Sequence, residues 1–287
     1  MGTSQSSNGS PAGVPMVPPW VPDLPLPDRP VENAGVGSDD QDGDQSSPER
    51  TPSNEPNQNI PIAPKVRFGG AKRSLGDYAS TGEKSSMRKG LGQYVKKGYG
   101  GSAIATRRMA STAQAAHGLY SALAGGNGNP FTSDGGMLDS ASMAGKTAYE
   151  IMDAVVEAVN PVDGTQDTEA CRASMKNALA DVLNLYPDAD LMNLSEEQRD
   201  IAIERFVARD IFNRIDLDLG KHIRAKAINA VTAMSRLKEV SEYVREMVVA
   251  SFKKLKSMGQ KLTGKAVTQV VQSAIRETYE VFEGYAE

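Results

Sequence analysis

The chain has 287 residues, of which 39% are hydrophobic and 6% aromatic, and a formal net charge of −4. These fractions are low for a protein that is globular throughout, so part of the chain is expected to remain unfolded. A single cysteine, Cys171, excludes an intramolecular disulfide and a cysteine-rich zinc site. We expect it to lie on a helix as a half-buried small hydrophobe. No apolar run approaches the roughly 20 residues of a membrane span, and the N-terminus lacks the pattern of a secretory signal. We therefore expect a cytoplasmic protein that does not engage a membrane.

The net charge conceals a strong asymmetry along the chain. Residues 1–64 carry a net charge of −7, residues 65–108 one of +9, and the remainder one of −6. Composition changes at nearly the same places, which predicts three parts. These are a disordered N-terminal segment (1–64), a basic, glycine-rich docking region (65–101) and an α-helical domain (102–287).

The first part is rich in proline, glycine and short polar side chains and holds few large apolar groups. Such a segment cannot offset the entropy lost on ordering its backbone, so residues 1–64 are predicted to be disordered when alone. The prolines from Pro15 to Pro30 favour an extended polyproline II backbone, and residues 38–59 indicate a solvated acidic spacer. The only tryptophan, Trp20, stands among these prolines in the string PMVPPWVP.

The second part contains a weak internal repeat. The string LGDY at 75–78 recurs as LGQY at 91–94, each preceded by basic residues, which indicates two short helical turns. The lysines and arginines of residues 65–108 are interleaved with aromatic residues, a pattern that could neutralise phosphates and stack on bases. It matches no standard nucleic-acid module, so protein docking is the favoured interpretation and nucleic-acid contact the alternative. The candidate contact residues are Arg67, Phe68, Lys72, Arg73, Tyr78, Arg88, Lys89, Tyr94, Lys96, Lys97, Tyr99, Arg107 and Arg108.

The third part has the pattern of successive helices. Residues 102–124 are expected to form one helix that ends at Gly125-Gly126. Residues 137–159 carry apolar side chains at the i, i+3, i+4 spacing of a buried stripe, and Asn160-Pro161 stops them.

Further helices follow to the end of the chain. Asp167 or Thr168 is expected to cap the next one, and a capping box that starts at Ser195 opens the one after it. Residues 222–258 fit one long helix, or two with a break near Met234–Ser235. With a last helix near the C-terminus, the pattern predicts an all-α bundle of about five to seven helices from residue 102 onward.

No catalytic constellation stands out from the sequence. Gly145-Lys146-Thr147 lacks the glycine that a phosphate-binding loop needs five positions earlier, where Ser140 stands. The only histidines, His117 and His222, are far apart and have no partner motif. We therefore predict that the chain is not an enzyme and holds neither cofactor nor metal ion.

The first residues offer one reactive group. Met1 is expected to be removed because Gly2 is small, which leaves an unhindered amine at Gly2. The pKa of such an amine is about 7.7–8.0 in general, so a fraction is neutral and nucleophilic near neutral pH.

Three stretches of the sequence resemble a known family. They are MGTSQSSNGSP with PMVPPWVP, RFGGAKRSLGDY with LGQYVKKGYGGS, and ATRRMASTAQAAHGLYSAL. These strings resemble the QatB family, a component of the bacterial Qat anti-phage system, most clearly over residues 2–22 and 66–124. The family supplies no catalytic residues to transfer to this chain.

The resemblance implies partners rather than a reaction. They are a P-loop ATPase (QatA), a QueC-like protein similar to 7-cyano-7-deazaguanine synthases (QatC) and a TatD-like nuclease (QatD). The resemblance implies a non-catalytic subunit that binds the QueC-like protein through its N-terminal segment. On this hypothesis Gly2, Thr3 and Ser4 enter the partner, Gly2 is the acceptor of a deazaguanine modification, and Pro18, Pro19 and Trp20 anchor the segment. The alternative is a nucleic-acid-binding adaptor that uses residues 65–108.

Overall fold

The computed structural model describes residues 13–27, 62–64, 66–124 and 143–286. These residues form an all-α protein, as predicted. Within the described ranges, the only β pairing is an isolated bridge between Pro15 and Ile62.

Two short helices come first, α1 (Gly69–Thr81) and α2 (Lys84–Gln93), and they pack against each other. α1 contains the LGDY string, and LGQY extends from the end of α2 to the first residue of the π-helical turn that follows, so the helical turns predicted there are confirmed. α1 ends at Gly82, whose φ of 81° lies in the left-handed region and whose amide donates to the carbonyl oxygen of Tyr78 (2.8 Å). Glycine adopts this conformation at little cost. A π-helical turn, Tyr94–Gly98, continues α2.

The single helix predicted over residues 102–124 is two helices, α3 (Ser102–Arg108) and α4 (Ala110–Ala122). The chain bends between them at Met109, which has φ −97° and ψ 17° and a buried side chain. The amide of Ser102 has no partner within its own helix, and it donates to the carboxylate of Glu283 at 2.9 Å. The predicted end at Gly125-Gly126 lies outside the described residues.

Capping boxes fix the start of two later helices. Thr147 and Glu150 form one at α6 (Ala148–Val159), so this helix begins well after residue 137, where the sequence predicts it to begin. It ends at Asn160, as predicted. Ser195 forms the predicted capping box at α8 (Glu196–Ile215). Both boxes satisfy amides that the helix itself leaves unpaired.

The helix between them, α7 (Gln166–Leu185), corrects another prediction. Its cap is Thr165, whose hydroxyl accepts the amide of Thr168 at 3.1 Å. The predicted caps, Asp167 and Thr168, therefore lie inside the first turn, and the carboxylate of Asp167 is available for partners on other helices.

The predicted long helix is divided into α9 (Lys221–Lys226) and α10 (Ala230–Ser257). The break lies at Ala227–Asn229 rather than near Met234–Ser235. The side chain of Asn229 accepts the amide of Thr232 at 2.8 Å, and asparagine is among the most favourable N-caps. The prediction of five to seven helices thus counts α3 and α4 as one helix, and α9 and α10 as another.

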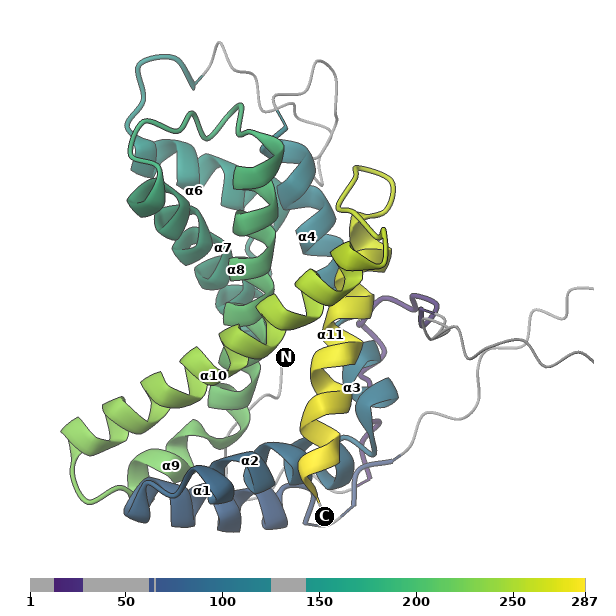
Figure 1. The fold of residues 1–287 in the computed structure, drawn as a ribbon, viewed down its shortest axis with the longest axis vertical. Helices are drawn as coiled ribbons and strands as arrows, with labels where there is room; N and C mark the ends of the chain where they lie inside the picture. Colours follow the sequence, from purple (N-terminus) through teal and green to yellow (C-terminus); the bar gives the residue numbers. More distant parts are fainter. Residues whose placement is uncertain (1–12, 28–61, 65, 125–142, 287) are drawn as a thin grey trace, which may run out of the picture.

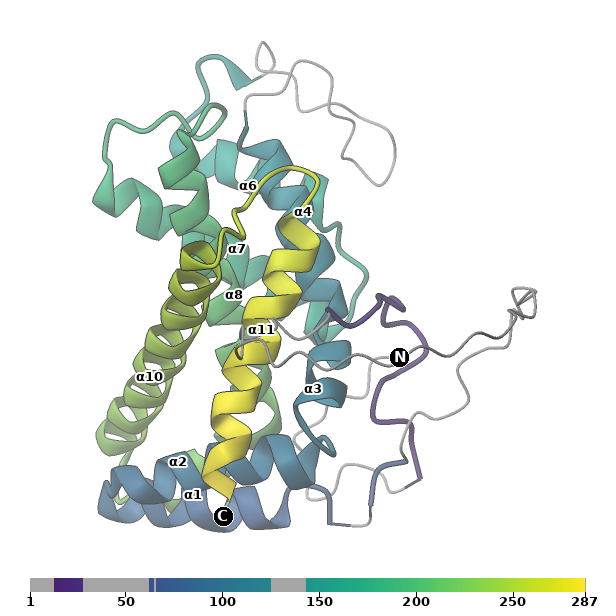
Figure 2. The same cartoon turned by 45° about the vertical axis from the view of Figure 1, so that its right-hand side comes forward.

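One hydrophobic core joins these helices to the C-terminal helix, α11 (Val267–Glu283). The core extends from Phe68, just before α1, to Phe282 in α11. α10 and α11 contact each other and lie side by side in Figure 2. α1 and α2 lie across one end of the molecule, and α6 and α7 lie at the other (Figure 1). Residues 66–101 therefore pack with the helical body, although the sequence assigns 65–101 to a docking region of its own.

Candidate functional site

Residues 13–27 lie against the helical body, although the sequence places them in a disordered segment (Figure 2, purple trace). Val17 and Val21 are 7% and 8% exposed and form a small hydrophobic cluster with Ala110 of α4. Two partly buried side chains pack on this cluster, Leu24 and Ile104. Burying a valine contributes roughly 1.5–3 kcal/mol, which helps to offset the entropy of ordering the segment.

Hydrogen bonds hold this docked segment, residues 13–27, at both ends. The amide of Gly13 donates to the carbonyl of Ala63 (3.1 Å), and the amide of Ala63 donates to the carbonyl of Val14 (2.9 Å). At the other end, Nη1 of Arg276 in α11 donates to the carbonyl of Pro27 (2.5 Å). The docked segment is therefore fixed to residues that lie far from it in the sequence.

Trp20 stands on a turn that leaves its side chain in solvent. The amide of Val21 donates to the carbonyl of Pro18 at 3.0 Å, so the predicted polyproline II backbone is interrupted here. Trp20 is 58% exposed, Pro19 is exposed and Pro18 is half-buried. Exposed tryptophan is typical of protein interaction surfaces. The other predicted partner-binding residues, Gly2, Thr3 and Ser4, lie outside the described residues.

A cavity of about 220 Å³ lies beside this turn. Trp20, Val21 and Pro22 line it together with residues of α3, α4, α7 and α8 and of the loop that precedes α7. Its ionisable lining residues are Arg108, Asp163, Asp167, Cys171, Asp210 and Arg214. The docked segment thus borders a charged recess of the helical body.

Asp167 bridges two arginines in this recess. Its carboxylate accepts Nη2 of Arg108 at 2.7 Å and Nη1 of Arg214 at 2.5 Å. Burial opposes the charge of Arg214, but the Asp167 carboxylate outweighs burial, so the pKa of the guanidinium is raised. Two buried guanidiniums share one carboxylate, which leaves this triad with a net positive charge.

Asp210 and Cys171 complete the recess. Asp210 accepts the hydroxyls of Thr112 (2.6 Å) and Ser174 (3.3 Å), yet burial raises the pKa of its carboxyl group. Burial also raises the pKa of the Cys171 thiol, and a neutral thiol is a poor nucleophile and metal ligand. The recess is therefore charged but offers no activated nucleophile, and the expectation that Cys171 is a buried helix residue is confirmed.

Sequence reasoning does not identify this cluster, because its members pair across distant parts of the chain. One signal was available. Asp210 and Arg214 follow Phe206 at intervals of four residues and so stand on the apolar face of α8. Charged residues rarely occupy such positions unless they are paired.

The aromatic residues of the basic stretch face the core. Tyr78 and Tyr94 are 0% exposed, Tyr99 is 2% exposed and Phe68 is 5% exposed. The hydroxyls of Tyr94 and Tyr99 both donate to Oδ2 of Asp218 at 2.8 Å. Rings buried in this way cannot stack on nucleic-acid bases.

The cations of the same stretch differ in position. Arg67 lies over the ring of Tyr99, 4.5 Å from its centroid, and Arg108 pairs with Asp167. Lys72 and Arg107 are half-buried. The candidate contact residues that stay exposed are Arg73, Arg88, Lys89, Lys96 and Lys97.

The described part of the chain contains no group of three His, Cys, Asp or Glu side chains placed to hold a metal ion. No helix in those ranges is long and apolar enough to cross a membrane. Gly145-Lys146-Thr147 lies in the turn and cap that precede α6, rather than in a loop after a strand.

The sequence matches one family model. Its description is Qat anti-phage system associated protein QatB, and the match covers residues 100–282, more than half of the chain. No curated protein and no solved structure matches. The matched range runs from the residue before Gly101 almost to the end of α11 and therefore includes the helices that line the recess.

Proposed function

Because the chain belongs to the QatB family of Qat anti-phage system associated proteins, we propose that it binds a QueC-like partner through its N-terminal segment as a non-catalytic subunit. Membership makes it a component of the Qat anti-phage system. The resemblance of its sequence to this family names the QueC-like protein (QatC) as the first partner. The ATPase (QatA) and the TatD-like nuclease (QatD) are further members of the system.

The exposed Trp20 on the docked segment is the observation that carries this proposal. Its neighbours Val17 and Val21 are buried, so the backbone around Trp20 is held while the indole ring remains in solvent. A side chain presented from a fixed backbone loses less entropy on binding. Tryptophan is also one of the residues that most often dominate interface energies.

Gly2 is proposed as the acceptor of a deazaguanine modification. The chain from Gly2 to Gly13 can reach at most about 40 Å when fully extended, enough for the amine to enter an active site beside the docked segment. The QueC-like partner would activate the carboxylate of the deazaguanine with ATP, which forms an acyl adenylate and releases pyrophosphate. The neutral Gly2 amine then attacks the acyl carbon, AMP leaves, and the nitrogen loses a proton to give an amide.

Intact mass of the full chain purified with active partner tests the modification. We expect the chain without Met1 to gain the mass of the deazaguanine carboxylic acid less one water, localised to the N-terminal peptide. A chain that has lost only Met1, in the presence of partner with demonstrated activity, overturns the acceptor role of Gly2.

A pair of tryptophan and tyrosine variants tests the anchor. Trp20→Ala should weaken binding of the QueC-like partner by roughly 30-fold, the effect of a hot-spot side chain worth about 2 kcal/mol. Tyr149→Ala removes another exposed aromatic ring, 70% exposed on α6, and serves as the control. Equal binding by both variants would remove Trp20 from the interface.

The nucleic-acid alternative retains one supporting observation, the exposed cations Arg73, Arg88, Lys89, Lys96 and Lys97. These can contact phosphates, but the buried rings of the same stretch leave no stacking partner among them. Affinity for DNA or RNA that falls steeply with salt would favour this alternative. An absence of salt-dependent binding by the full chain would eliminate it.

A further inference from the structure

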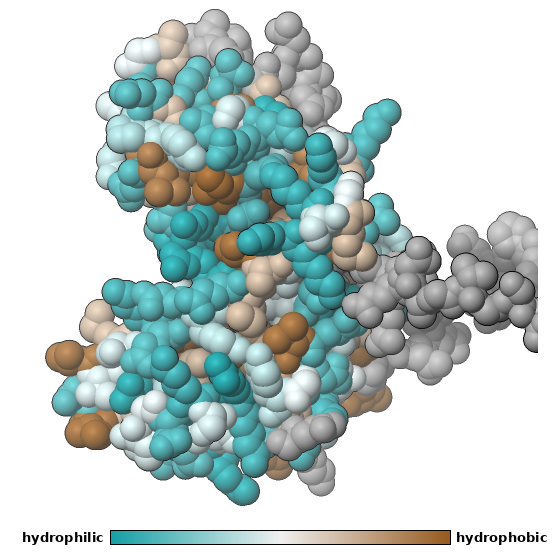
Figure 3. Space-filling view, in the orientation of Figure 1, coloured by the Kyte–Doolittle hydropathy of each residue, from teal (hydrophilic) through white to brown (hydrophobic). Residues whose placement is uncertain are grey.

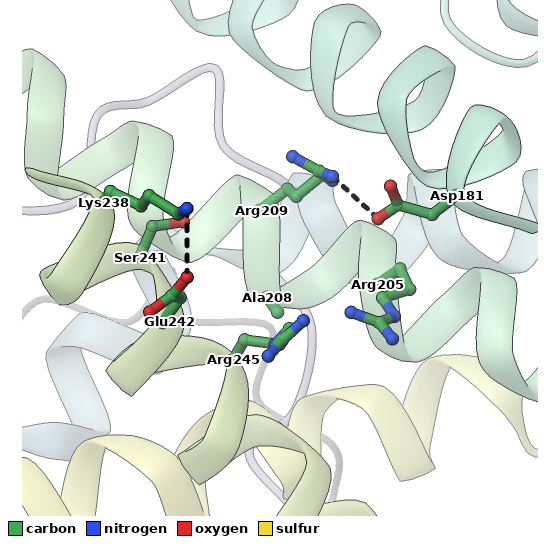
Figure 4. Close-up of a pocket in the computed structure, with 8 residues that line it drawn as sticks. All are labelled: Asp181, Arg205, Ala208, Arg209, Lys238, Ser241, Glu242 and Arg245. Carbon is green, nitrogen blue, oxygen red and sulfur yellow. Dashed lines mark hydrogen bonds and ion pairs between the residues drawn. The ribbon is translucent and has the colours of Figure 1, made fainter. Parts of the chain in front are cut away.

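A second cavity, of about 260 Å³, lies where α8 meets α10, on the side of α7. Its lining residues are Asp181, Arg205, Ala208, Arg209, Lys238, Ser241, Glu242 and Arg245. The buried Ala208 contributes only a methyl group there (Figure 4). The face seen in Figure 3 is hollowed at mid-height, and mainly hydrophilic side chains surround the hollow. No residue of this cavity takes part in the docked segment or in the recess beside it.

Two of the cations that line this cavity already have carboxylate partners. Nη2 of Arg209 lies 2.7 Å from Oδ2 of Asp181. Nζ of Lys238 lies 3.8 Å from Oε1 of Glu242. Both pairs are drawn as dashed lines in Figure 4. The two carboxylates of the cavity are thereby neutralised.

Arg205 and Arg245 have no such partner. Among the described residues, neither forms an ion pair or a side-chain hydrogen bond. The charge of Arg205 only opposes the rise that burial causes in the pKa of its neighbour Glu204. Their guanidinium groups come from different helices and point toward one another across the cavity (Figure 4). Two like charges that face one cavity repel each other, and a bound dianion would remove that repulsion.

We propose that this cavity binds a small ligand through a phosphate group, held between the guanidiniums of Arg205 and Arg245. Guanidinium groups match phosphate oxygens with paired hydrogen bonds. The hydroxyl of Ser241 supplies a further donor from the wall of the cavity. Since α8 and α10 pack against each other, both arginines are presented from rigid supports.

The size of the cavity favours a small ligand over a nucleic-acid strand. It lies just below the roughly 300–1,000 Å³ of pockets that enclose whole small molecules, so it fits a phosphorylated head group. A strand would need a row of unpaired cations along its backbone, whereas this cavity supplies two.

Calorimetric titration of the full chain with pyrophosphate, at constant ionic strength set with chloride, tests the proposal. We expect saturable binding at one site, weakened about tenfold or more in R205Q/R245Q, because losing a charge-assisted hydrogen bond costs about a factor of ten in affinity or more. The control K253Q/K261Q removes the same charge from exposed positions outside the cavity and should bind as the wild type does. The proposal is overturned if the wild type does not bind, if R205Q/R245Q binds equally well, or if a single-stranded oligonucleotide binds more tightly at equal phosphate concentration.

A second variant guards against an effect of misfolding. Ser241 stands one helical turn before Arg245 on α10, so Ser241→Asp adds a carboxylate to the wall of the cavity. We expect this protein to unfold at a higher temperature than the wild type without ligand and to lose pyrophosphate binding. A lower unfolding temperature together with wild-type binding would show that the guanidiniums do not converge on a shared anion site.

Discussion

Two regions whose composition differs from that of the helical domain take opposite places in this molecule. The docked segment, residues 13–27, is rich in proline and lies on the surface, where it buries Met16, Val17, Val21 and Pro27. Residues 66–101, which are rich in glycine and highly charged, are built into the core through Phe68, Tyr78, Tyr94 and Tyr99. The difference lies in the large side chains rather than in the glycines. Aromatic and leucine residues that recur at helical spacing bring even a basic stretch inside, whereas the prolines of residues 13–27 prevent a helix and leave a few apolar side chains to dock on the surface.

Substitution of Tyr94 should produce the largest loss in the free energy of unfolding. Tyr94→Ala removes a fully buried ring at the centre of the 66–101 region, and we expect the free energy of unfolding to fall by about 3–5 kcal/mol in urea titrations. Tyr149→Ala removes an exposed ring and should change it by less than about 0.5 kcal/mol. Similar losses in the two variants would mean that residues 66–101 are not part of the core.

Alkaline pH should destabilise the same region. Burial, followed by the charge of Asp218, raises the pKa of Tyr99 to about 12. The folded state therefore binds the proton more tightly than the unfolded state, so stability is complete below pH 10 and is lost as pH rises from about 10 to 12, by roughly 3 kcal/mol. Denaturant titrations at stepped pH should show this decline, with a shallower slope in Tyr99→Phe. An identical slope in that variant would assign the decline to other groups.

The close approach of α2 to the C-terminal end of the chain should give a smaller loss of stability when it is disturbed. A Cβ added at Gly92 would lie 2.8 Å from the carbonyl oxygen of Phe282 and still closer to the backbone of Tyr285 and Ala286. Gly92→Ala should therefore cost about 1–3 kcal/mol, despite the better helix propensity of alanine. Gly284→Ala meets nothing within 4 Å and is the matched control. Equal unfolding midpoints for these variants would contradict the packing of α2 on the C-terminal end of the chain.

The docked segment should show the smallest effect on unfolding. Val21→Ala removes two methyl groups from the cluster with Val17 and Ala110 and should cost roughly 1 kcal/mol, confined to local release of the segment. Limited proteolysis should then cut residues 13–27 faster while the helical body persists. Val162→Ala, at a 59% exposed position, should leave the digestion rate unchanged. A global loss of stability in Val21→Ala would show that the segment belongs to the core.

Local signals in the sequence are enough to predict some features of the structure. The Ser195 capping box, the stop at Asn160 and the buried Cys171 follow from neighbouring residues and are confirmed. The bridge from Asp167 to Arg108 and Arg214 spans 59 and 47 residues, so spacing along one helix cannot reveal it. The break at Met109 is likewise set by how α3 and α4 pack on other helices. The docking of residues 13–27 could not be predicted from the sequence, because two valines among prolines show neither helical nor strand periodicity.

The pairing of Gly13 and Val14 with Ala63 has a consequence for how the sequence can vary. It closes the intervening chain into a loop whose two ends are fastened at one place. The entropy of closing a loop grows only with the logarithm of its length, so doubling its length costs only about 0.6 kcal/mol. Residues 28–61 can therefore lengthen or shorten considerably without moving Trp20 from its place on the helical body.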